Sequence, residues 1–225
     1  MGTVKILVPY RGDNGRRDEL WTFTHHWLKP LNYPITVGES PDGIFNRAAA
    51  INHAAEKAGD WDVALIMDAD TILPHHQLHA AVTTAQTTGK LTAAFTSVVE
   101  LNQECTDHVM ATGDLNLATL GIENHRQGSM IDESSALACP RRLWEKVEGF
   151  DEHFAGWSCE DNAFWKAATI MGGPPERIPG HAYHLWHPIN RPNNTSPQYR
   201  YNQRRWKHYA RARTEADLKR VRDLP

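Results

Sequence analysis

The sequence contains few cysteines, no long apolar run and no large excess of one charge. Its only cysteines, Cys105, Cys139 and Cys159, have no C-x-x-C spacing, so neither a disulfide framework nor a zinc finger is expected. No apolar stretch approaches the roughly 20 residues that a membrane-spanning helix needs. Residues 1–10 resemble a short strand rather than a signal peptide. These absences predict a cytoplasmic globular protein with no membrane partner.

The charge that is present is divided unevenly along the chain. The 225 residues carry a formal net charge of −3, which gives no general attraction to polyanions. Residues 1–190 hold 14 lysines and arginines against 24 acidic residues, whereas residues 191–225 hold 10 against 3. We therefore expect a main domain at 1–190 and a basic loop and helix at 191–225. The basic segment is interpreted as a solvated helix, or as a flap that closes over an anionic ligand through Arg200, Arg204 or Arg205. Contact with nucleic acid is a third alternative.

Apolar patterning alternates short strands with helices. This alternation predicts an α/β fold with a mixed, mostly parallel central sheet flanked by helices. Polar, glycine-interrupted residues 102–130 receive no assignment, and residues 188–197 are expected to form a loop. The expected strands lie at 4–8, 35–37, 63–67, 91–99, 135–139, 177–178 and 182–186, and the expected helices at 18–28, 45–58, 74–88, 140–148, 160–171 and 199–213.

Two carboxylates directly follow the most apolar of the expected strands. Asp68 and Asp70 come immediately after residues 63–67, and open α/β sheets bind ligands beyond the carboxyl ends of their strands. At this i, i+2 spacing both side chains can approach one divalent cation and its nucleotide phosphates. Such oxygen ligands suit Mg²⁺ or Mn²⁺. Because a D-x-D motif is short, the alternative is a pair of polar turn residues.

Three of the 13 histidines stand late in the chain within an apolar frame. They are His181, His184 and His187, and imidazole ligands would favour Mn²⁺ over Mg²⁺ in a site that also contains carboxylates. The alternative is that they are packed core residues. His75 and His79 also have a spacing suited to a metal, but we interpret them as part of a solvated helix face.

The densest group of unusual residues lies between 149 and 162. Glycines there bracket aromatic residues, and Glu160 and Asp161 stand at the expected start of a helix, where the helix dipole favours negative charge. One interpretation is helix capping alone. The other is that one carboxylate acts as the general base for an acceptor hydroxyl.

Together these segments resemble the GT-A glycosyltransferases, most closely the β-1,4-galactosyltransferase family, and are also similar to the polypeptide N-acetylgalactosaminyltransferases. The likeness covers about residues 4–188 and implies the GT-A fold. Several motifs carry it, in the family's order: Val8-Pro9-Tyr10-Arg11, Phe45-Asn46-Arg47-Ala48, Asp68-Ala69-Asp70, Ser135-Ala136-Leu137, and Gly149-Phe150 followed by Gly156-Trp157 and Glu160-Asp161.

The resemblance implies a role for each matching residue. Asp161 would be the catalytic base and Glu160 would hold the acceptor. Asp70, His184 and His187 would bind the metal, with His181 competing for one of the histidine places. The donor and its nucleotide would be bound by Pro9, Tyr10, Arg11, Phe45, Arg47, Asp68 and Trp157, with Trp157 on a mobile loop beside the donor sugar.

By this resemblance the protein would use Mn²⁺ or Mg²⁺ to move a sugar from a UDP-sugar to an acceptor hydroxyl, with inversion. The acceptor class stays open and includes nucleic acid. The alternatives are a sugar-nucleotide nucleotidyltransferase and a catalytically silent sugar-binding domain. Departures from the family are Asp132-Glu133-Ser134 in place of Gly-Gly, and Ser158 in place of the second glycine of Gly-Trp-Gly. The signal anchor and disulfide cysteines of Golgi members are not seen, which implies a bacterial or viral cytoplasmic setting.

Overall fold

The computed structural model describes residues 2–116, 118, 122–127, 133–188 and 196–224. Its central sheet has six strands in the order β2-β1-β3-β8-β5-β9. Strand β8 runs antiparallel to both of its neighbours, whereas the other adjoining pairs are parallel. The sheet consists of β1 (Val4–Pro9), β2 (Ile35–Gly38), β3 (Val63–Met67), β5 (Thr92–Ala93), β8 (Ala136–Pro140) and β9 (Glu176–Arg177). The expected α/β class with a mixed, mostly parallel sheet is confirmed.

A second, four-stranded sheet has the order β4-β10-β6-β7. Its strands are β4 (Thr71–Ile72), β6 (Ser97–Leu101), β7 (Ile122–Gln127) and β10 (His181–His184). Strand β10 pairs antiparallel with β4, which follows Asp70 directly, so that His184 is opposite Thr71. The late histidines and the early carboxylates are therefore brought together by strand pairing.

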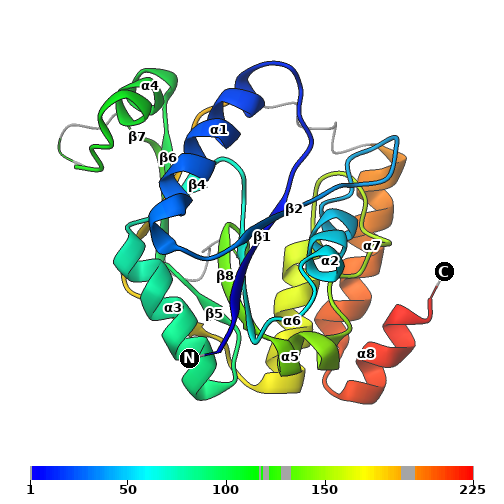
Figure 1. Cartoon of the computed structure of the whole chain (residues 1–225). Helices are drawn as coiled ribbons and strands as arrows, with labels where there is room; N and C mark the ends of the chain where they lie inside the picture. The colour runs from blue at the N-terminus through cyan, green and yellow to red at the C-terminus, as the bar shows by residue number, and fades with distance from the viewer. Residues whose placement is uncertain (1, 117, 119–121, 128–132, 189–195, 225) are drawn as a thin grey trace.

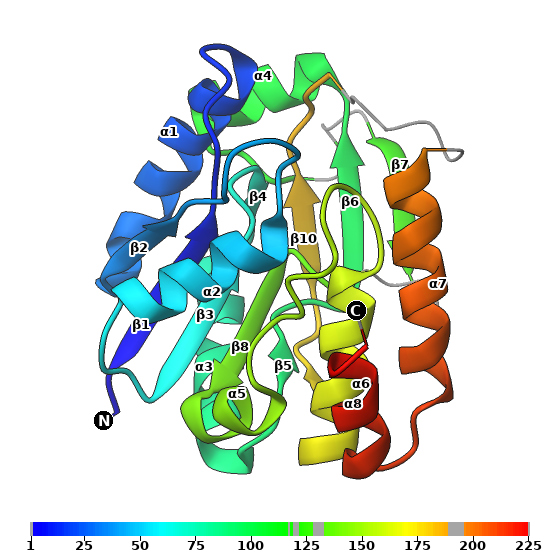
Figure 2. The same cartoon turned by 90° about the vertical axis from the view of Figure 1, so that its right-hand side faces the viewer.

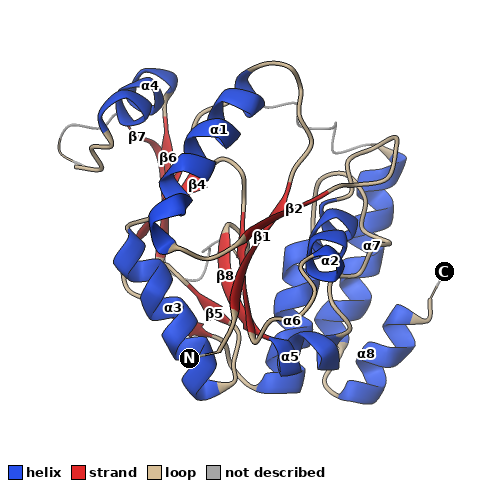
Figure 3. Cartoon of the chain, in the orientation of Figure 1, coloured by secondary structure: helices blue, strands red, loops and turns tan. Residues whose placement is uncertain are grey.

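Helices cover both faces of the central sheet (Figures 1 and 3). On one side lie α1 (Arg16–Leu28), which continues into a short 3₁₀ turn (Lys29–Leu31), and α3 (His75–Thr88). On the other side lie α2 (Arg47–Lys57), α5 (Arg141–Val147) and α6 (Glu160–Gly172). Helices α7 (Pro197–Arg211) and α8 (Glu215–Arg222) pack against α6, and Figure 2 shows α7 and α8 on the face turned to the viewer. Helix α4 (Gln103–Thr112) lies beside the second sheet.

The core explains the layered arrangement. All five residues of β3 are buried, as expected for a strand covered on both faces. Gly38 at the end of β2 allows α2 to approach closely, because a Cβ atom there would lie 1.8 Å from the Ala50 carbonyl oxygen. A smaller cluster that includes Leu20, Val99 and Tyr183 joins α1 to the second sheet.

The structure differs from the expected elements in the second half. The single strand expected at 91–99 is two strands, β5 and β6, which belong to different sheets. The unassigned region contains α4 and β7, and α8 was not expected. The expected domain boundary at residue 190 lies outside the described residues. Among the helices that the structure describes, none has the length and apolar character that crossing a membrane requires.

Candidate active site

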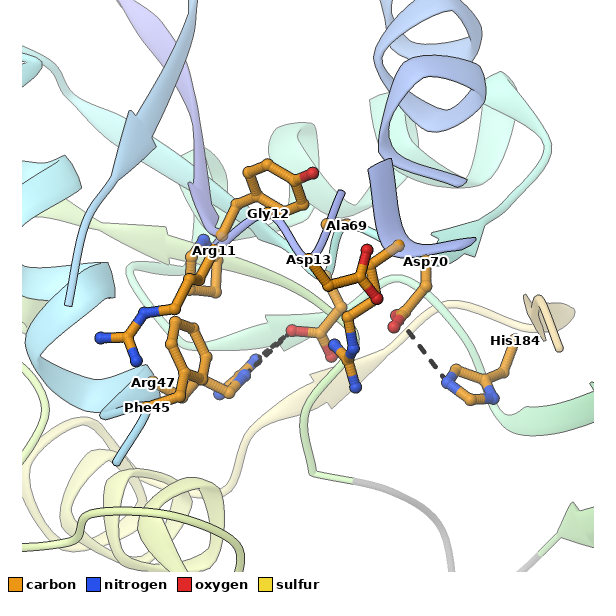
Figure 4. Close-up of a pocket in the computed structure, with 12 residues that line it drawn as sticks. Arg11, Gly12, Asp13, Phe45, Arg47, Ala69, Asp70 and His184 are labelled. Atoms are coloured by element: carbon orange, nitrogen blue, oxygen red, sulfur yellow. Dashed lines mark hydrogen bonds and ion pairs between the residues drawn. The ribbon is translucent and has the colours of Figure 1, made fainter. Parts of the chain in front are cut away.

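A cavity of about 450 Å³ opens where β1 and β3 end, at their carboxyl ends. Figure 4 shows Arg11, Asp13, Phe45, Arg47, Asp70 and His184 around it. Most of the residues expected to bind the donor or the metal are thus together. The lining comprises Pro9, Tyr10, Arg11, Gly12, Asp13, Arg17, Phe45, Arg47, Asp68, Ala69, Asp70 and His184.

Asp68 is bound to protein groups through both of its carboxylate oxygens. Its Oδ1 accepts hydrogen bonds from Arg47 Nε at 2.9 Å and Arg47 Nη2 at 2.6 Å. Its Oδ2 accepts from the Ser134 hydroxyl at 3.2 Å and the Ser135 backbone N–H at 3.1 Å. Burial opposes the charge on Arg47, but the carboxylates of Asp68, Glu160 and Asp161 outweigh it and raise the guanidinium pKa above its ordinary value. Asp68 therefore anchors Arg47 in the cavity wall.

Asp70 faces the late histidines instead. Its Oδ2 lies 3.3 Å from His187 Nε2 and its Oδ1 lies 3.8 Å from His184 Nε2. One ligand atom from each of these three residues lies within 4.8 Å of the other two. Burial alone would raise the pKa of Asp70, but the hydrogen bond from His187 and the charges of the two imidazoles hold it well below its usual range. Asp70, His184 and His187 could together hold one metal ion, and we call them the metal triad.

His181 lies outside this triad. It is paired with Ser97 across the second sheet, and its ring packs edge-on against His125, with 5.3 Å between the ring centroids. Burial and the neighbouring His125 lower the pKa of His181. Of the three candidate histidines, the structure therefore groups His184 and His187 with Asp70.

The far wall of the cavity combines an aromatic ring with cations. The Arg11 guanidinium carbon lies 5.4 Å from the centroid of the Phe45 ring, and Arg11 donates to the Gly43 carbonyl at 2.7 Å. The Tyr10 hydroxyl donates to the Asp18 carboxylate, and burial followed by this contact raises the pKa of Tyr10. The Tyr10 ring, rather than its hydroxyl, is thus free to shape the cavity.

Glu160 and Asp161 begin α6 beside Arg47. Glu160 is buried, and its Oε1 lies 3.8 Å from Arg47 Nη1. Burial and the adjacent Asp161 carboxylate raise the pKa of Glu160 to about 8, although Arg47 opposes the shift. Among the described residues, the buried Arg47 Nη1 has no hydrogen-bond acceptor. Arg47 Nη1 is thus a hydrogen-bond donor without an acceptor among the described residues, and it lies beside Glu160.

The loop before α6 carries Trp157 and is held by α7. Asn202 is fully buried, and its side-chain N–H₂ lies within hydrogen-bond distance of the carbonyl oxygens of Ala155 at 2.9 Å, Ser158 at 3.2 Å and Trp157 at 3.4 Å. Gln203 donates to the Ser158 hydroxyl at 2.8 Å. Two side chains of α7 thus hold this loop, Asn202 through the loop backbone and Gln203 through the Ser158 side chain.

A buried ion pair holds the start of the same loop. Asp151 accepts from Arg205 Nε at 2.7 Å and from the Tyr209 hydroxyl at 2.8 Å. Arg205 also donates to the Leu224 carbonyl at 2.9 Å. Arg205, expected as one candidate for contact with an anionic ligand, is instead committed to this network, while Arg200 and Arg204 are exposed on α7.

Trp157 does not line the main cavity. It is 50% exposed and stacks on Tyr199 of α7, with ring centroids 5.9 Å apart. Both rings line a separate, mainly apolar groove of about 410 Å³. The groove adjoins the main cavity through the backbone, because Gly156 N–H donates to the Phe45 carbonyl at 2.8 Å. We call it the Trp157 groove.

Sequence reasoning missed several residues of the site. Arg17 and Asp13 line the cavity at the entrance to α1, where the only available signal was a cluster of charge and glycine. Asn202 could not be found, because its role depends on contact with a loop more than 40 positions earlier in the chain.

The fold is the GT-A fold of nucleotide-sugar transferases, which confirms the fold expected from the motifs. A mutant of Drosophila β1,4-galactosyltransferase 7, in complex with manganese, UDP-Gal and xylobiose, superposes with a TM-score of 0.52 at 17% identity, over 89% of this chain and 74% of that one. GalNAc-T7 with UDP, GalNAc and Mn²⁺ gives a TM-score of 0.56 at 13% identity, over 93% of this chain and 50% of that one.

Glucosyl-3-phosphoglycerate synthase from Mycobacterium tuberculosis, in complex with Mn²⁺, UDP-glucose and phosphoglyceric acid, gives a TM-score of 0.52 at 13% identity, over 100% of this chain and 81% of that one. No protein-family model matches the chain. No curated protein sequence matches it either. The likeness is thus one of fold.

Proposed function

We propose that this protein is a metal-dependent glycosyltransferase that moves a sugar from a UDP-sugar to an acceptor hydroxyl with inversion. The observation that carries the proposal is the metal triad at a cavity formed by strand ends in a GT-A fold. Solved structures of similar fold hold Mn²⁺ with UDP or a UDP-sugar, which supports the donor class. We assign the transfer domain to residues 1–190.

The metal triad fits a divalent transition metal. It offers one carboxylate and two imidazoles, a mixed oxygen and nitrogen set that suits Mn²⁺ better than Mg²⁺. Asp70, His184 and His187 would hold the ion. A bound ion would offset the negative charge of a UDP leaving group.

The cavity wall supplies the groups for the nucleotide. Phe45, with Arg11 stacked on it, offers a flat surface suited to uracil. Arg47 brings positive charge to the cavity wall, where it would attract the UDP diphosphate, while its Nε and Nη2 stay on Asp68. Pro9 and the Tyr10 ring complete the wall.

The acidic pair divides into two roles. Burial and the adjacent Asp161 raise the pKa of Glu160 above its ordinary value, which favours a protonated carboxyl that can donate a hydrogen bond to an acceptor oxygen. The negative charge of the pair then falls on Asp161, which accepts the proton of the acceptor hydroxyl as that oxygen attacks the sugar. Inversion follows if this single base activates the acceptor oxygen for direct attack on the sugar.

The two alternatives have less support. A sugar-nucleotide nucleotidyltransferase would call for a glycine-rich phosphate loop early in the chain, and residues 12–15 provide only Gly-Asp-Asn-Gly. A silent sugar-binding domain would need neither the metal triad nor Asp161.

The test is UDP release from a panel of UDP-Gal, UDP-Glc, UDP-GlcNAc and UDP-GalNAc with Mn²⁺, together with calorimetric binding of UDP. We expect one of the four UDP-sugars to be hydrolysed slowly in the absence of an acceptor. We also expect the Asp70→Ala variant to lose Mn²⁺-dependent UDP binding. Asp13→Ala is the matched control, because Asp13 lines the same cavity outside the triad. Full Mn²⁺-dependent UDP affinity in Asp70→Ala would refute the metal assignment.

A further inference from the structure

Helix α7 carries a row of cations on its outer face. Arg200, Arg204, Lys207 and Arg211 follow the spacing i, i+4, i+7 and i+11, which places them on one face of the helix. All four are exposed. Their span of eleven residues corresponds to about 17 Å along the helix axis. We call them the α7 row.

The α7 row has no acidic counterpart within the described part of the chain. No salt bridge or side-chain hydrogen bond to another described residue engages any of its members. The opposite face of α7 is occupied by Asn202, Arg205 and Tyr209, which are buried against the loop before α6. The positive charge is thus directed to solvent, whereas residues 1–190 are strongly acidic. A polyanion would be attracted to this helix more than to the acidic residues 1–190.

The row leads to the Trp157 groove. Pro197 lines the groove and precedes Arg200 by three residues, so it lies on the same face of α7. The groove is also lined by Ile44 and Trp157, which are 60% and 50% exposed. A flat aromatic surface at the end of a basic track is the combination that binds single-stranded nucleic acid, in which the backbone follows the charges and a base stacks on the ring.

We propose that the α7 row and the Trp157 groove form a binding surface for single-stranded nucleic acid, with phosphates on the row and one base against Trp157. The assignment rests on the proposed function, since it names the class of acceptor that this surface would present to Asp161. An anionic membrane fits less well. The exposed apolar side chains lie at one end of the row only, so a helix lying flat on a bilayer would have nothing apolar to insert along its length.

The first test measures binding of a fluorescent 20-nucleotide oligothymidylate by anisotropy. Four phosphate contacts predict a slope of about −3 in log K against log salt, or a roughly 50-fold loss of affinity between 50 and 200 mM salt. The Arg200→Gln, Arg204→Gln, Lys207→Gln and Arg211→Gln variant should lose most of this slope. The matched control replaces Lys29, Lys57, Arg142 and Lys219 by Gln, which removes the same charge from exposed positions elsewhere. Equal binding by the two quadruple variants, or no binding by the natural protein, would overturn the proposal.

The second test separates nucleic acid from other polyanions. An abasic oligonucleotide of the same length should bind with the same salt slope but roughly 5- to 100-fold more weakly, because it cannot stack on Trp157. Equal affinity for the abasic strand, or row-dependent binding to phosphatidylserine vesicles without binding to oligothymidylate, would overturn it. These measurements use neither metal nor UDP-sugar. A failed UDP-binding test therefore refutes the proposed function separately from this surface.

Discussion

The two acidic clusters of the site are held in place by different means. Asp68 and Asp70 lie at the end of a buried strand, and His184 ends a strand that pairs directly beside them. Their positions are thus fixed by backbone ladders. Glu160 and Asp161 follow an irregular loop, whose backbone is held by side chains of α7. The half proposed to bind the metal is therefore built into the sheet, whereas the half proposed to bind the acceptor depends on a helix that comes later in the chain.

This difference implies that the two halves can be damaged separately. Changes in α7 should disturb Trp157 and the acidic pair while the metal triad keeps its geometry. The four predictions that follow test this separation, beginning with the largest effect.

Asp161→Asn should abolish transfer and leave nucleotide binding unchanged. Loss of a general base lowers turnover by roughly 10²- to 10⁴-fold. Calorimetry with Mn²⁺ and UDP should give the natural affinity within about twofold, because Asp161 is not part of the metal triad. Turnover close to that of the natural protein would remove Asp161 from the mechanism.

Asp151→Asn should destabilise the protein by about 3–5 kcal/mol, because it leaves the buried Arg205 without its charge partner. Burial would raise the pKa of Asp151, but hydrogen bonds from Arg205, His153 and Tyr209 outweigh it and lower the pKa. The stabilisation is therefore present above the ordinary aspartate pKa and is lost as the pH falls below it. Urea unfolding at pH 7 and pH 3 measures both effects, with exposed Asp60→Asn as the control. A variant as stable as the control at pH 7 would contradict the network.

Asn202→Asp should loosen the loop before α6, because a carboxylate would face three carbonyl oxygens that now face an N–H₂ group. A displaced loop of this kind costs up to about 100-fold in turnover. Binding of UDP with Mn²⁺ should not change. The control is His208→Gln at an exposed position of the same helix. If UDP binding and turnover fall together, the two halves are not separable.

Glu160→Gln should have the smallest effect, a change in how stability depends on pH. The pKa of Glu160 is raised to about 8 from an ordinary 4.5, so the folded protein keeps a proton that the unfolded chain releases. Stability should fall as the pH rises from about 4.5 to 8 and then level off, and the variant should lack this fall. Thermal scans at pH 5 and pH 9 should show a difference in Tm between the variant and the natural protein that widens toward high pH. A constant gap would mean that Glu160 is ionised throughout.

The contrast between the halves also explains what the sequence could predict. The strands at 4–8 and 63–67, and the carboxylates after them, follow from local apolar patterning, and this part of the fold is confirmed. The prediction of one strand at 91–99 was wrong, because hydrophobic periodicity does not reveal that the chain passes from one sheet to the other at residues 94–96. Helix α4 was missed although Asn102 caps its start and Gly113 ends it. The cause was the polar character of the segment.

For the site, the motifs predicted most of the residues that line the cavity, but not that Trp157 lines a separate groove. Asp70, His184 and His187 come together as the resemblance implied, and the residues alone did not favour this set over one with Asp68 or His181. The hydrogen bonds from Asn202 join distant parts of the chain through single side chains, for which a sequence holds no periodic signal. The roles of the acidic pair stay predictions.

The backbone just before α6 has one further consequence. Ser158 and Cys159 have φ angles of 109° and 74°, a region that glycine enters freely and other residues enter at a cost of about 1–3 kcal/mol each. Here the hydrogen bonds from the side-chain amides of Asn202 and Gln203 offset that conformational cost. A chain with glycine at position 158 would need less support from the helix. Substitutions at position 158 and at Asn202 or Gln203 should therefore have non-additive effects on stability.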